Sequence, residues 1–195
     1  MVSELAGGGA PLHGEQLALD LANTSYAARG RPVEGLRSAE HLGAWLRDVR
    51  PRLEVTVGDA DLLAVTEADV EAAIRLRTAI RALAGAATSG DELPDEAVAT
   101  VNAFARTAPH WRELRPEPEP HVEVHGPATP VAAALAAVAE DAVALFGGPD
   151  RLELRPCSGP GCVLFFLRSA ARREYCSSGC GNRARAARHY ARTRG

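Results

Sequence analysis

The residues in this chain best suited to chemistry are its four cysteines. Four residues separate the first two, thirteen the middle two and three the last two: Cys157, Cys162, Cys176 and Cys180. Two close pairs joined by a hairpin-sized gap suit a tetrahedral zinc site, because each pair can supply two thiolates from one turn. Four thiolates also close the coordination sphere, so we expect one structural Zn²⁺ and no catalytic metal. The alternatives are reduced structural thiols without a metal, or a redox pair.

The sequence around the cysteines predicts a small treble-clef-like finger. Gly159-Pro160-Gly161 lets the backbone turn tightly inside the first pair. Residues 163–167 are strand-like, and residues 173–175 could return antiparallel to them. From Cys180 to Arg192 the chain has no proline and one early glycine, which favours a helix.

The predicted C-terminal helix carries a basic stripe. Residues 151–195 hold ten arginines and two acids, 10 − 2 = +8, whereas residues 1–150 hold 12 basic and 23 acidic residues, 12 − 23 = −11. Concentrated positive charge suits phosphate backbones. The alternatives are a solvated face, or a surface for an acidic partner or for the acidic part of this chain. The candidate nucleic-acid contacts are Arg185, Arg188 and Arg192 on one side of the helix, with Arg168, Arg172 and Arg173 on the nearby hairpin.

Five further polar residues are candidates for other roles. Asn182 could orient the thiolates or cap the helix. Arg183 falls off the basic stripe, and we hypothesise that it pairs with Asp20 and so links the two halves of the chain. Asp20, Asn23 and Thr24 interrupt an apolar segment and could line a small-molecule pocket. The alternative is a turn or cap whose polar groups bond to the backbone.

Residues 1–149 are predicted to form a mainly helical domain. Apolar residues at steps of three and four, with capping residues and prolines at the ends, predict helices over 39–49, 66–87, 94–105 and 130–146. A two-stranded hairpin is expected over 111–115 and 122–125, and residues 17–22 fit either a strand or a helical turn. The predicted fold is therefore mainly α, with a helical domain over 1–149 and the finger over 150–195.

Composition and targeting signals restrict the class of protein. The 195 residues are 46% hydrophobic and 24% charged, which is typical of globular proteins. No apolar run reaches the roughly 20 residues of a membrane helix, and the start lacks a signal-peptide pattern, so we expect a cytoplasmic protein without membrane contact. No catalytic constellation is evident, and we expect no enzyme.

Two motifs resemble known families. Cys180-Gly181-Asn182-Arg183, followed by residues 184–192, resembles the CGNR zinc finger, and residues 17–24 with residues 42–46 resemble the ABATE-type domain that precedes it. The resemblance implies four cysteine zinc ligands and a stress-related bacterial transcriptional regulator. The sequence departs from the usual finger where Arg168 stands in place of an Asp after the Phe-Leu run.

The resulting hypothesis is a DNA-binding transcriptional regulator whose finger presents an arginine-rich helix to phosphates. The helical domain would bind a small-molecule effector or form a homodimer. The alternative is a zinc-stabilised protein-interaction module that does not bind nucleic acid.

Overall fold

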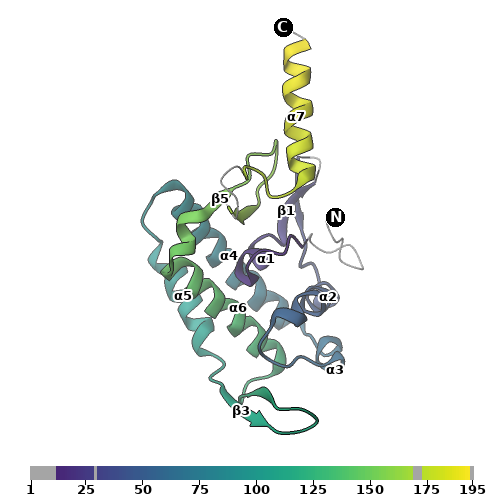
Figure 1. The fold of residues 1–195 in the computed structure, drawn as a ribbon, viewed down its shortest axis with the longest axis vertical. Coiled ribbons are helices and arrows are strands. Elements are labelled where there is room, and N and C mark those ends of the chain that lie inside the picture. Colours follow the sequence, from purple (N-terminus) through teal and green to yellow (C-terminus); the bar gives the residue numbers. More distant parts are fainter. Residues whose placement is uncertain (1–11, 29, 169–172, 194–195) are drawn as a thin grey trace.

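The computed structural model describes residues 12–28, 30–168 and 173–193 (Figure 1). Seven helices, two short 3-10 helices and three two-stranded hairpins follow one another within these residues. In chain order they are α1 (Leu17–Ala22), β1 (Ser25–Ala28), β2 (Arg31–Glu34), α2 (Ala39–Val49), η1 (Arg50–Arg52), α3 (Asp59–Leu63), α4 (Glu67–Ser89), α5 (Asp95–Arg106), β3 (Trp111–Arg115), β4 (His121–His125), α6 (Pro130–Gly147), η2 (Pro149–Glu153), β5 (Leu154–Pro156), β6 (Phe165–Leu167) and α7 (Ser178–Thr193). The mainly α prediction is confirmed.

The long helices begin and end at the residues that the sequence marks. At the start of α4, Thr66 and Asp69 form a reciprocal capping box, with the Asp69 amide 3.3 Å from Thr66 Oγ1 and the Thr66 amide 2.9 Å from Asp69 Oδ2. Gly90 ends α4 with φ +78°, a conformation that glycine adopts without strain. Thr129 caps α6 ahead of Pro130, its hydroxyl accepting from the Ala132 amide.

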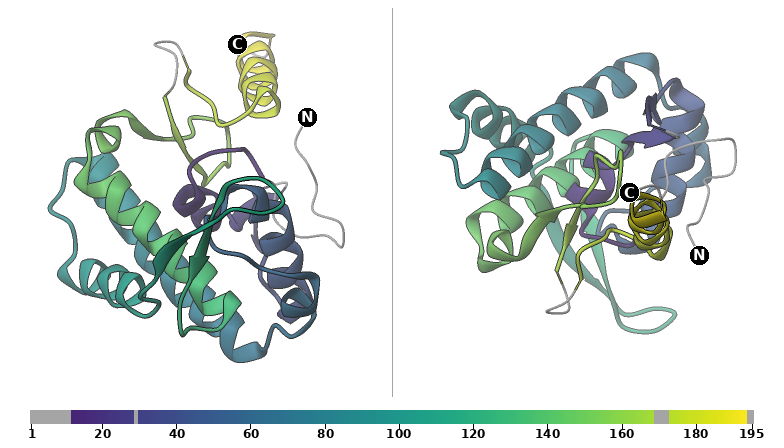
Figure 2. Two further views of the ribbon diagram at one scale, coloured as in Figure 1. Left: turned by 60° about the horizontal axis from the view of Figure 1, so that its bottom comes forward. Right: turned by 90° about the horizontal axis from the view of Figure 1, so that it is seen from above.

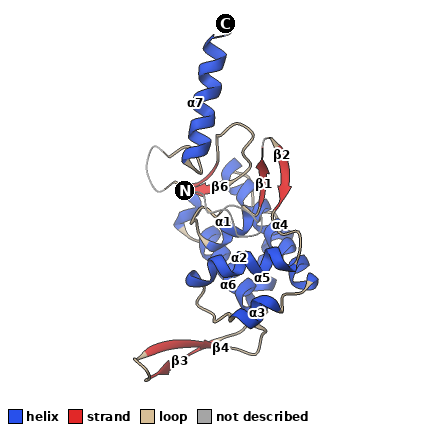
Figure 3. Ribbon diagram, turned by 90° about the vertical axis from the view of Figure 1, so that its right-hand side faces the viewer, coloured by secondary structure: helices blue, strands red, loops and turns tan. Residues whose placement is uncertain are grey.

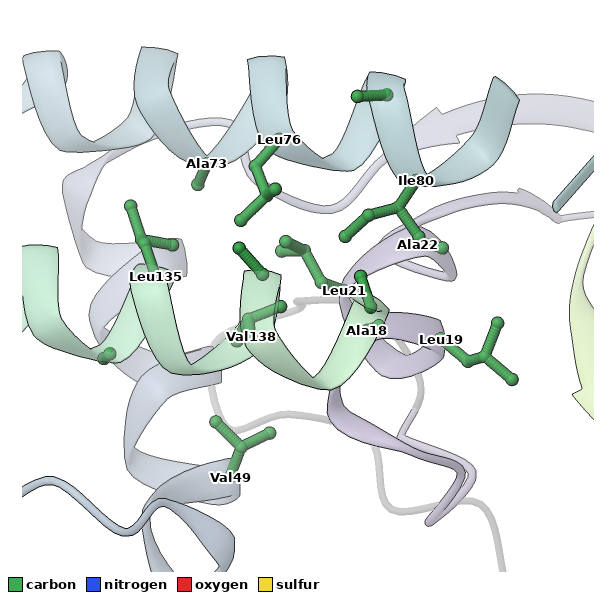
Figure 4. Close-up of a cluster of buried hydrophobic side chains, with 14 of the residues drawn as sticks. Ala18, Leu19, Leu21, Ala22, Val49, Ala73, Leu76, Ile80, Leu135 and Val138 are labelled. Atoms are coloured by element: carbon green, nitrogen blue, oxygen red, sulfur yellow. The ribbon is translucent and has the colours of Figure 1, made fainter. Parts of the chain in front are cut away.

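The core lies where α1 packs against α4 and α6 (Figure 4). Residues 17–22 form a helix, and its apolar residues after Leu17 are completely buried, among them Leu19 and Leu21. Small residues such as Ala73 on α4 allow the helices to approach closely around this short central segment. The apolar helix α6 has the length and composition of a membrane span, yet half of it is buried inside the protein, as expected of a core helix.

The hairpins differ from the sequence prediction in two places. The β3–β4 hairpin was expected and projects from the bundle (Figure 3), with Leu114 and Val122 paired across it and both largely exposed. The β1–β2 hairpin was not expected. β6 was predicted to pair with residues 173–175 but pairs with β5, Phe166 lying opposite Arg155. The prediction was wrong because the partner strand, β5, lies before the first cysteine and not between the two cysteine pairs.

An ion pair between a buried arginine and a partly exposed glutamate fixes the β1–β2 hairpin to α4. Arg77 is only 5% exposed although it falls on the apolar face of α4, and its guanidinium donates to both carboxylate oxygens of Glu34 at 2.5 Å. It also donates to Thr24 Oγ1 at 3.2 Å. Burial tends to raise the pKa of Glu34, but hydrogen bonds from Arg77 and from the amides of Leu36 and Gly35 outweigh it, so this pKa lies below its ordinary value.

Replacing Glu34 by Gln should therefore make stability less dependent on pH. Because the pKa of Glu34 is lowered in the folded protein, its carboxylate stabilises the fold fully above pH 4.5, the ordinary pKa of a glutamate. This stabilisation is lost as the pH falls through the pKa of Glu34 in the folded protein. Glu34→Gln should lower the free energy of unfolding at pH 7 by about 1 to 2 kcal/mol, a moderate loss because Glu34 is partly exposed. The difference from the wild type should shrink below pH 4.5. Urea unfolding at several pH values measures both.

Glu40→Gln on the exposed side of α2 is the matched control. Burial raises the pKa values of Asp20 and Asp141, and their pH dependence has the opposite sign, but both proteins share these groups and the effect cancels in the difference. Loss of zinc at low pH also affects the wild type and Glu34→Gln equally. A Glu34→Gln deficit that stayed constant from pH 7 to pH 3.5 would contradict the assignment.

Candidate metal centre

The four cysteines come from two short segments that the backbone folds together. Cys157 follows β5, and its amide donates to the Leu164 carbonyl at 2.9 Å, while the Cys162 amide donates to the Gly159 carbonyl at 2.9 Å. These bonds close the tight turn predicted inside the first pair. A side chain at Gly159 would place its Cβ 2.9 Å from the Cβ of Cys180, so only glycine fits where the two segments meet.

The sulfur geometry fits one tetrahedral zinc ion. All four Sγ atoms lie within 4.8 Å of one another, with Cys162 and Cys176 at 3.8 Å and Cys176 and Cys180 at 3.4 Å. A tetrahedron with Zn–S bonds of about 2.3 Å has S–S edges of about 3.8 Å. The centre holds one structural Zn²⁺, coordinated by the four predicted cysteines.

The chain supplies N–H groups to the sulfurs, as thiolates require. Cys157 Sγ accepts from the amides of Gly159 and Cys176 at 3.4 and 3.3 Å, and Cys180 Sγ accepts from the Arg183 guanidinium at 2.9 Å. Hydrogen bonds from the neighbouring thiols lower the pKa of Cys157, and the same pairings with Cys157 raise the pKa values of Cys162 and Cys176. Without a cation, these crowded sulfurs cannot all be thiolates. A bound metal removes that conflict because it stabilises every deprotonated ligand.

A seam of polar contacts joins β6 to the helical part of the chain. Asn23, completely buried, donates to the Phe165 carbonyl at 2.9 Å and accepts from the Phe165 amide at 3.0 Å. Glu15 accepts from the Leu167 amide at 3.0 Å through one carboxylate oxygen and from Arg173 at 2.5 Å through the other. Arg81 of α4 donates to the Val163 carbonyl at 3.1 Å and lies over the Phe165 ring.

These contacts correct the predicted pocket. Asp20, Asn23 and Thr24 are at most 1% exposed. Asp20 pairs with Arg52 at 2.5 Å, Asn23 holds β6, and the Thr24 hydroxyl donates to the Leu21 carbonyl at 2.7 Å. All three are used inside the protein, so they do not line a small-molecule site.

The predicted coupling of Asp20 to Arg183 is also wrong. Asp20 is held by Arg52, whereas Arg183 donates to Cys180 Sγ and thus contacts the metal centre. Asn182, predicted either to orient the thiolates or to cap the helix, is exposed, and its side-chain oxygen accepts from Arg185. The link between the two halves is made by Glu15, Asn23 and Arg81.

The predicted basic residues fall into different groups. Arg173 is not available to a nucleic acid, because it binds Glu15, donates to the carbonyls of Leu167 and Cys176, and lies over the Phe166 ring. Arg168 is paired with Glu153 at 3.0 Å. Arg172 lies outside the described residues.

The stripe on α7 is exposed. Arg185, Arg188 and Arg192 all lie in the part of α7 after Ala184, where every described side chain is exposed. Arg188 donates to the Tyr175 hydroxyl at 3.1 Å, which leaves most of its guanidinium free to contact a ligand. Figures 1 and 2 show α7 extending away from the helical part of the chain.

Two family models cover most of the chain. The ABATE model, described as "Putative stress-induced transcription regulator", matches residues 15–149. The chain belongs to the ABATE family. The CGNR zinc finger model matches residues 153–193, which include all four cysteines. A search of curated proteins found no match to this ABATE protein. The first description names a putative regulator, the second names a zinc finger, and neither names an enzyme.

Sequence reasoning missed the residues that join the finger to the ABATE part. Glu15 precedes the apolar residues 17–22, and nothing in the sequence connects it with Arg173. Arg77 gave a usable signal, because a charged residue on the apolar face of a helix requires a buried partner. Arg81, one turn further along α4, donates to the carbonyls of Ala22 and Ser25.

Loss of one zinc ligand should unfold the finger. We expect Cys180→Ser to reduce zinc affinity by at least roughly 100-fold, because metal binding and folding of such a module are one equilibrium. Atomic emission spectrometry would measure the zinc content, and hydrogen exchange would measure protection in α7. Ser158→Ala, an exposed neighbour of Cys157, is the control and should keep one zinc per chain. Retention of a full equivalent by Cys180→Ser would refute the four-cysteine site.

Removing the Asn23 amide should loosen the seam. Asn23→Ala leaves the amide and carbonyl of Phe165 without their partners, and each buried unpaired group costs about 1 to 3 kcal/mol. We expect the free energy of unfolding to fall by about 2 to 4 kcal/mol and the Phe165 amide to lose exchange protection. Asn102→Ala on α5 is the control. A loss equal to that of the control would show that the seam does not stabilise the protein.

Proposed function

We propose that this ABATE protein is a cytoplasmic DNA-binding transcriptional regulator whose α7 helix contacts the phosphate backbone. One observation carries the proposal: the second half of α7 is an arginine-bearing helix that no other part of the described chain covers. The last acidic residue of the chain is Glu174, so no carboxylate along α7 neutralises the stripe. An uncovered positive helix beside a rigid metal centre suits association with a polyanion.

The arrangement favours an external partner over the acidic ABATE part of the same chain. If the +8 and −11 segments neutralised each other, the stripe would lie against the helical domain. Instead α7 extends away from it (Figure 1). Among the described residues from 151 onward, the arginines with acidic partners are Arg168 and Arg173, near the seam.

Within the proposal, the three stripe residues have the leading role. Arg185, Arg188 and Arg192 would contact phosphates, and those that reach base edges would supply sequence preference. Arg172 remains a candidate contact, and Arg168 would have to exchange its pairing with Glu153. The ABATE part would respond to an effector or form the dimer that a symmetric DNA site requires.

The stripe can be tested by salt-dependent binding to genomic duplex fragments. Binding should weaken steeply as salt rises, because each neutralised phosphate releases counterions. Arg185→Ala/Arg188→Ala/Arg192→Ala should lose specific enrichment, and the slope of log K against log salt should fall by about three units, roughly 0.9 for each phosphate contact. Fluorescence anisotropy with the enriched fragments gives both quantities.

The control variant removes the same charge from the ABATE surface, as Arg47→Ala/Arg75→Ala/Arg106→Ala, all three residues being exposed. It should bind as the wild type does. An equal loss of DNA binding in the stripe variant and the control variant would show that the effect depends on net charge alone. Undiminished binding by the stripe variant would reject α7 as the contact. Binding to acidic proteins but to no duplex would favour the protein-interaction alternative.

A further inference from the structure

A cavity of about 500 Å³ opens directly onto the metal centre. One wall comes from β1, with Tyr26 and Ala28, and another from the turn inside the first cysteine pair, with Pro160. Three of the four zinc ligands line it: Cys162, Cys176 and Cys180. The ABATE part of the chain therefore forms one side of an opening through which small molecules can reach the sulfurs.

The four sulfurs are not equally accessible. Cys157, Cys176 and Cys180 are buried, and Cys162 is the ligand with partial exposure. Cys157 and Cys180 also accept the N–H···S hydrogen bonds described above, which draw electron density from the sulfur. A molecule entering the cavity meets the Cys162 sulfur in the most accessible position.

The charge around the cavity selects the molecules that can enter. Four thiolates around one divalent cation carry two net negative charges. Among the described residues that line the cavity, Arg183 is the one permanent cation, so it offsets half of that charge. Anions are therefore disfavoured, while a neutral molecule enters without electrostatic cost. The apolar surfaces of Tyr26, Pro160 and Leu164 also suit a small uncharged reagent.

We propose that Cys162 is a site of covalent modification by small neutral peroxides that enter through this cavity. The Cys162 sulfur attacks one peroxide oxygen: the S–O bond forms, the O–O bond breaks, and the leaving oxygen takes a proton from water. The product is a sulfenic acid. The Cys176 sulfur, 3.8 Å away, then attacks the Cys162 sulfur, the S–O bond breaks, and the hydroxide leaves as water after protonation. The two cysteines lose two electrons, which the peroxide accepts.

The disulfide removes two of the four zinc ligands. With Cys162 and Cys176 bonded to each other, Cys157 and Cys180 alone cannot complete the tetrahedral set, so zinc leaves. Cys180 lies in the first turn of α7, and Cys176 lies just before it. Release of the metal therefore frees the start of the helix that carries the arginine stripe. Loss of DNA binding after oxidation would follow, and this consequence alone rests on the proposed function.

The first test measures which cysteine reacts and whether the cavity is the route. The intact zinc-loaded protein is treated with hydrogen peroxide, zinc release is followed with a chromogenic chelator, and the cysteines are mapped by mass spectrometry. The earliest product should be a Cys162–Cys176 disulfide, formed at the rate of zinc release. Ala28→Phe, which fills the cavity from the exposed last residue of β1, should slow both by about fivefold or more, because it restricts access to the thiolate. Ala99→Phe, at an exposed position of α5, is the control.

The second test measures charge selection with two alkylating reagents of nearly equal size. Iodoacetamide is neutral and iodoacetate is anionic; in both, the sulfur displaces iodide and a C–S bond forms. The rate ratio of the neutral to the anionic reagent at Cys162 should exceed the ratio for free cysteine by about tenfold, because the centre repels anions. Equal ratios, first reaction at another cysteine, or a wild-type rate in Ala28→Phe would each overturn the proposal. Neither experiment involves DNA, so both test the reaction at Cys162 even if the protein does not bind DNA.

Discussion

The C-terminal part of this ABATE protein depends on the attraction between four thiolates and one divalent cation. Around the sulfurs, the only buried apolar side chains in the same cluster of described residues are Leu164 and Phe166, with Tyr26 and Tyr175 at its margin. So small a core cannot by itself hold a segment of about 40 residues folded. Metal coordination replaces that missing core. Because Cys176 and Cys180 lie on either side of the start of α7, the same bonds also fix the direction of the helix.

The contacts between the ABATE part and the finger fix the orientation of the finger more than they bury apolar surface. Leu154 at the start of β5 belongs to the main apolar core, and Phe165 and Leu167 pack against it. The contacts with strict geometry are polar: Asn23 to both backbone groups of Phe165, and Glu15 to Leu167 and Arg173. Hydrogen bonds tolerate little change in angle, whereas apolar surfaces can slide. A metal centre attached in this way has one position relative to the helical domain.

The sequence supports prediction where the signal is local and fails where partners are distant. Thr66 with Asp69, and Thr129 with Pro130, mark helix starts within four residues, and the cysteine spacing implies its own metal geometry. In contrast, Glu15 and Arg173 are 158 residues apart, and the partner of Asn23 is a backbone group with no sequence signature. Arg173 was assigned to a nucleic-acid surface because exposed and buried arginines are alike in sequence; only the fold distinguishes them. The β1–β2 hairpin is too short for alternation to reveal it.

In the exposed half of α7, after Ala184, helix formation and charge are coupled. Arg185, Arg188 and Arg192 follow one another at steps of three and four residues, so like charges face each other along one side of the helix. Their repulsion works against the helix, and after Ala184 no side chain of the described chain is buried to compensate for it, the hydrogen bond from Arg188 to Tyr175 being exposed. A polyanion that shields these charges strengthens the helix as it binds. Folding of the last turns and association are then a single equilibrium, and the apparent affinity includes the free energy of completing the helix.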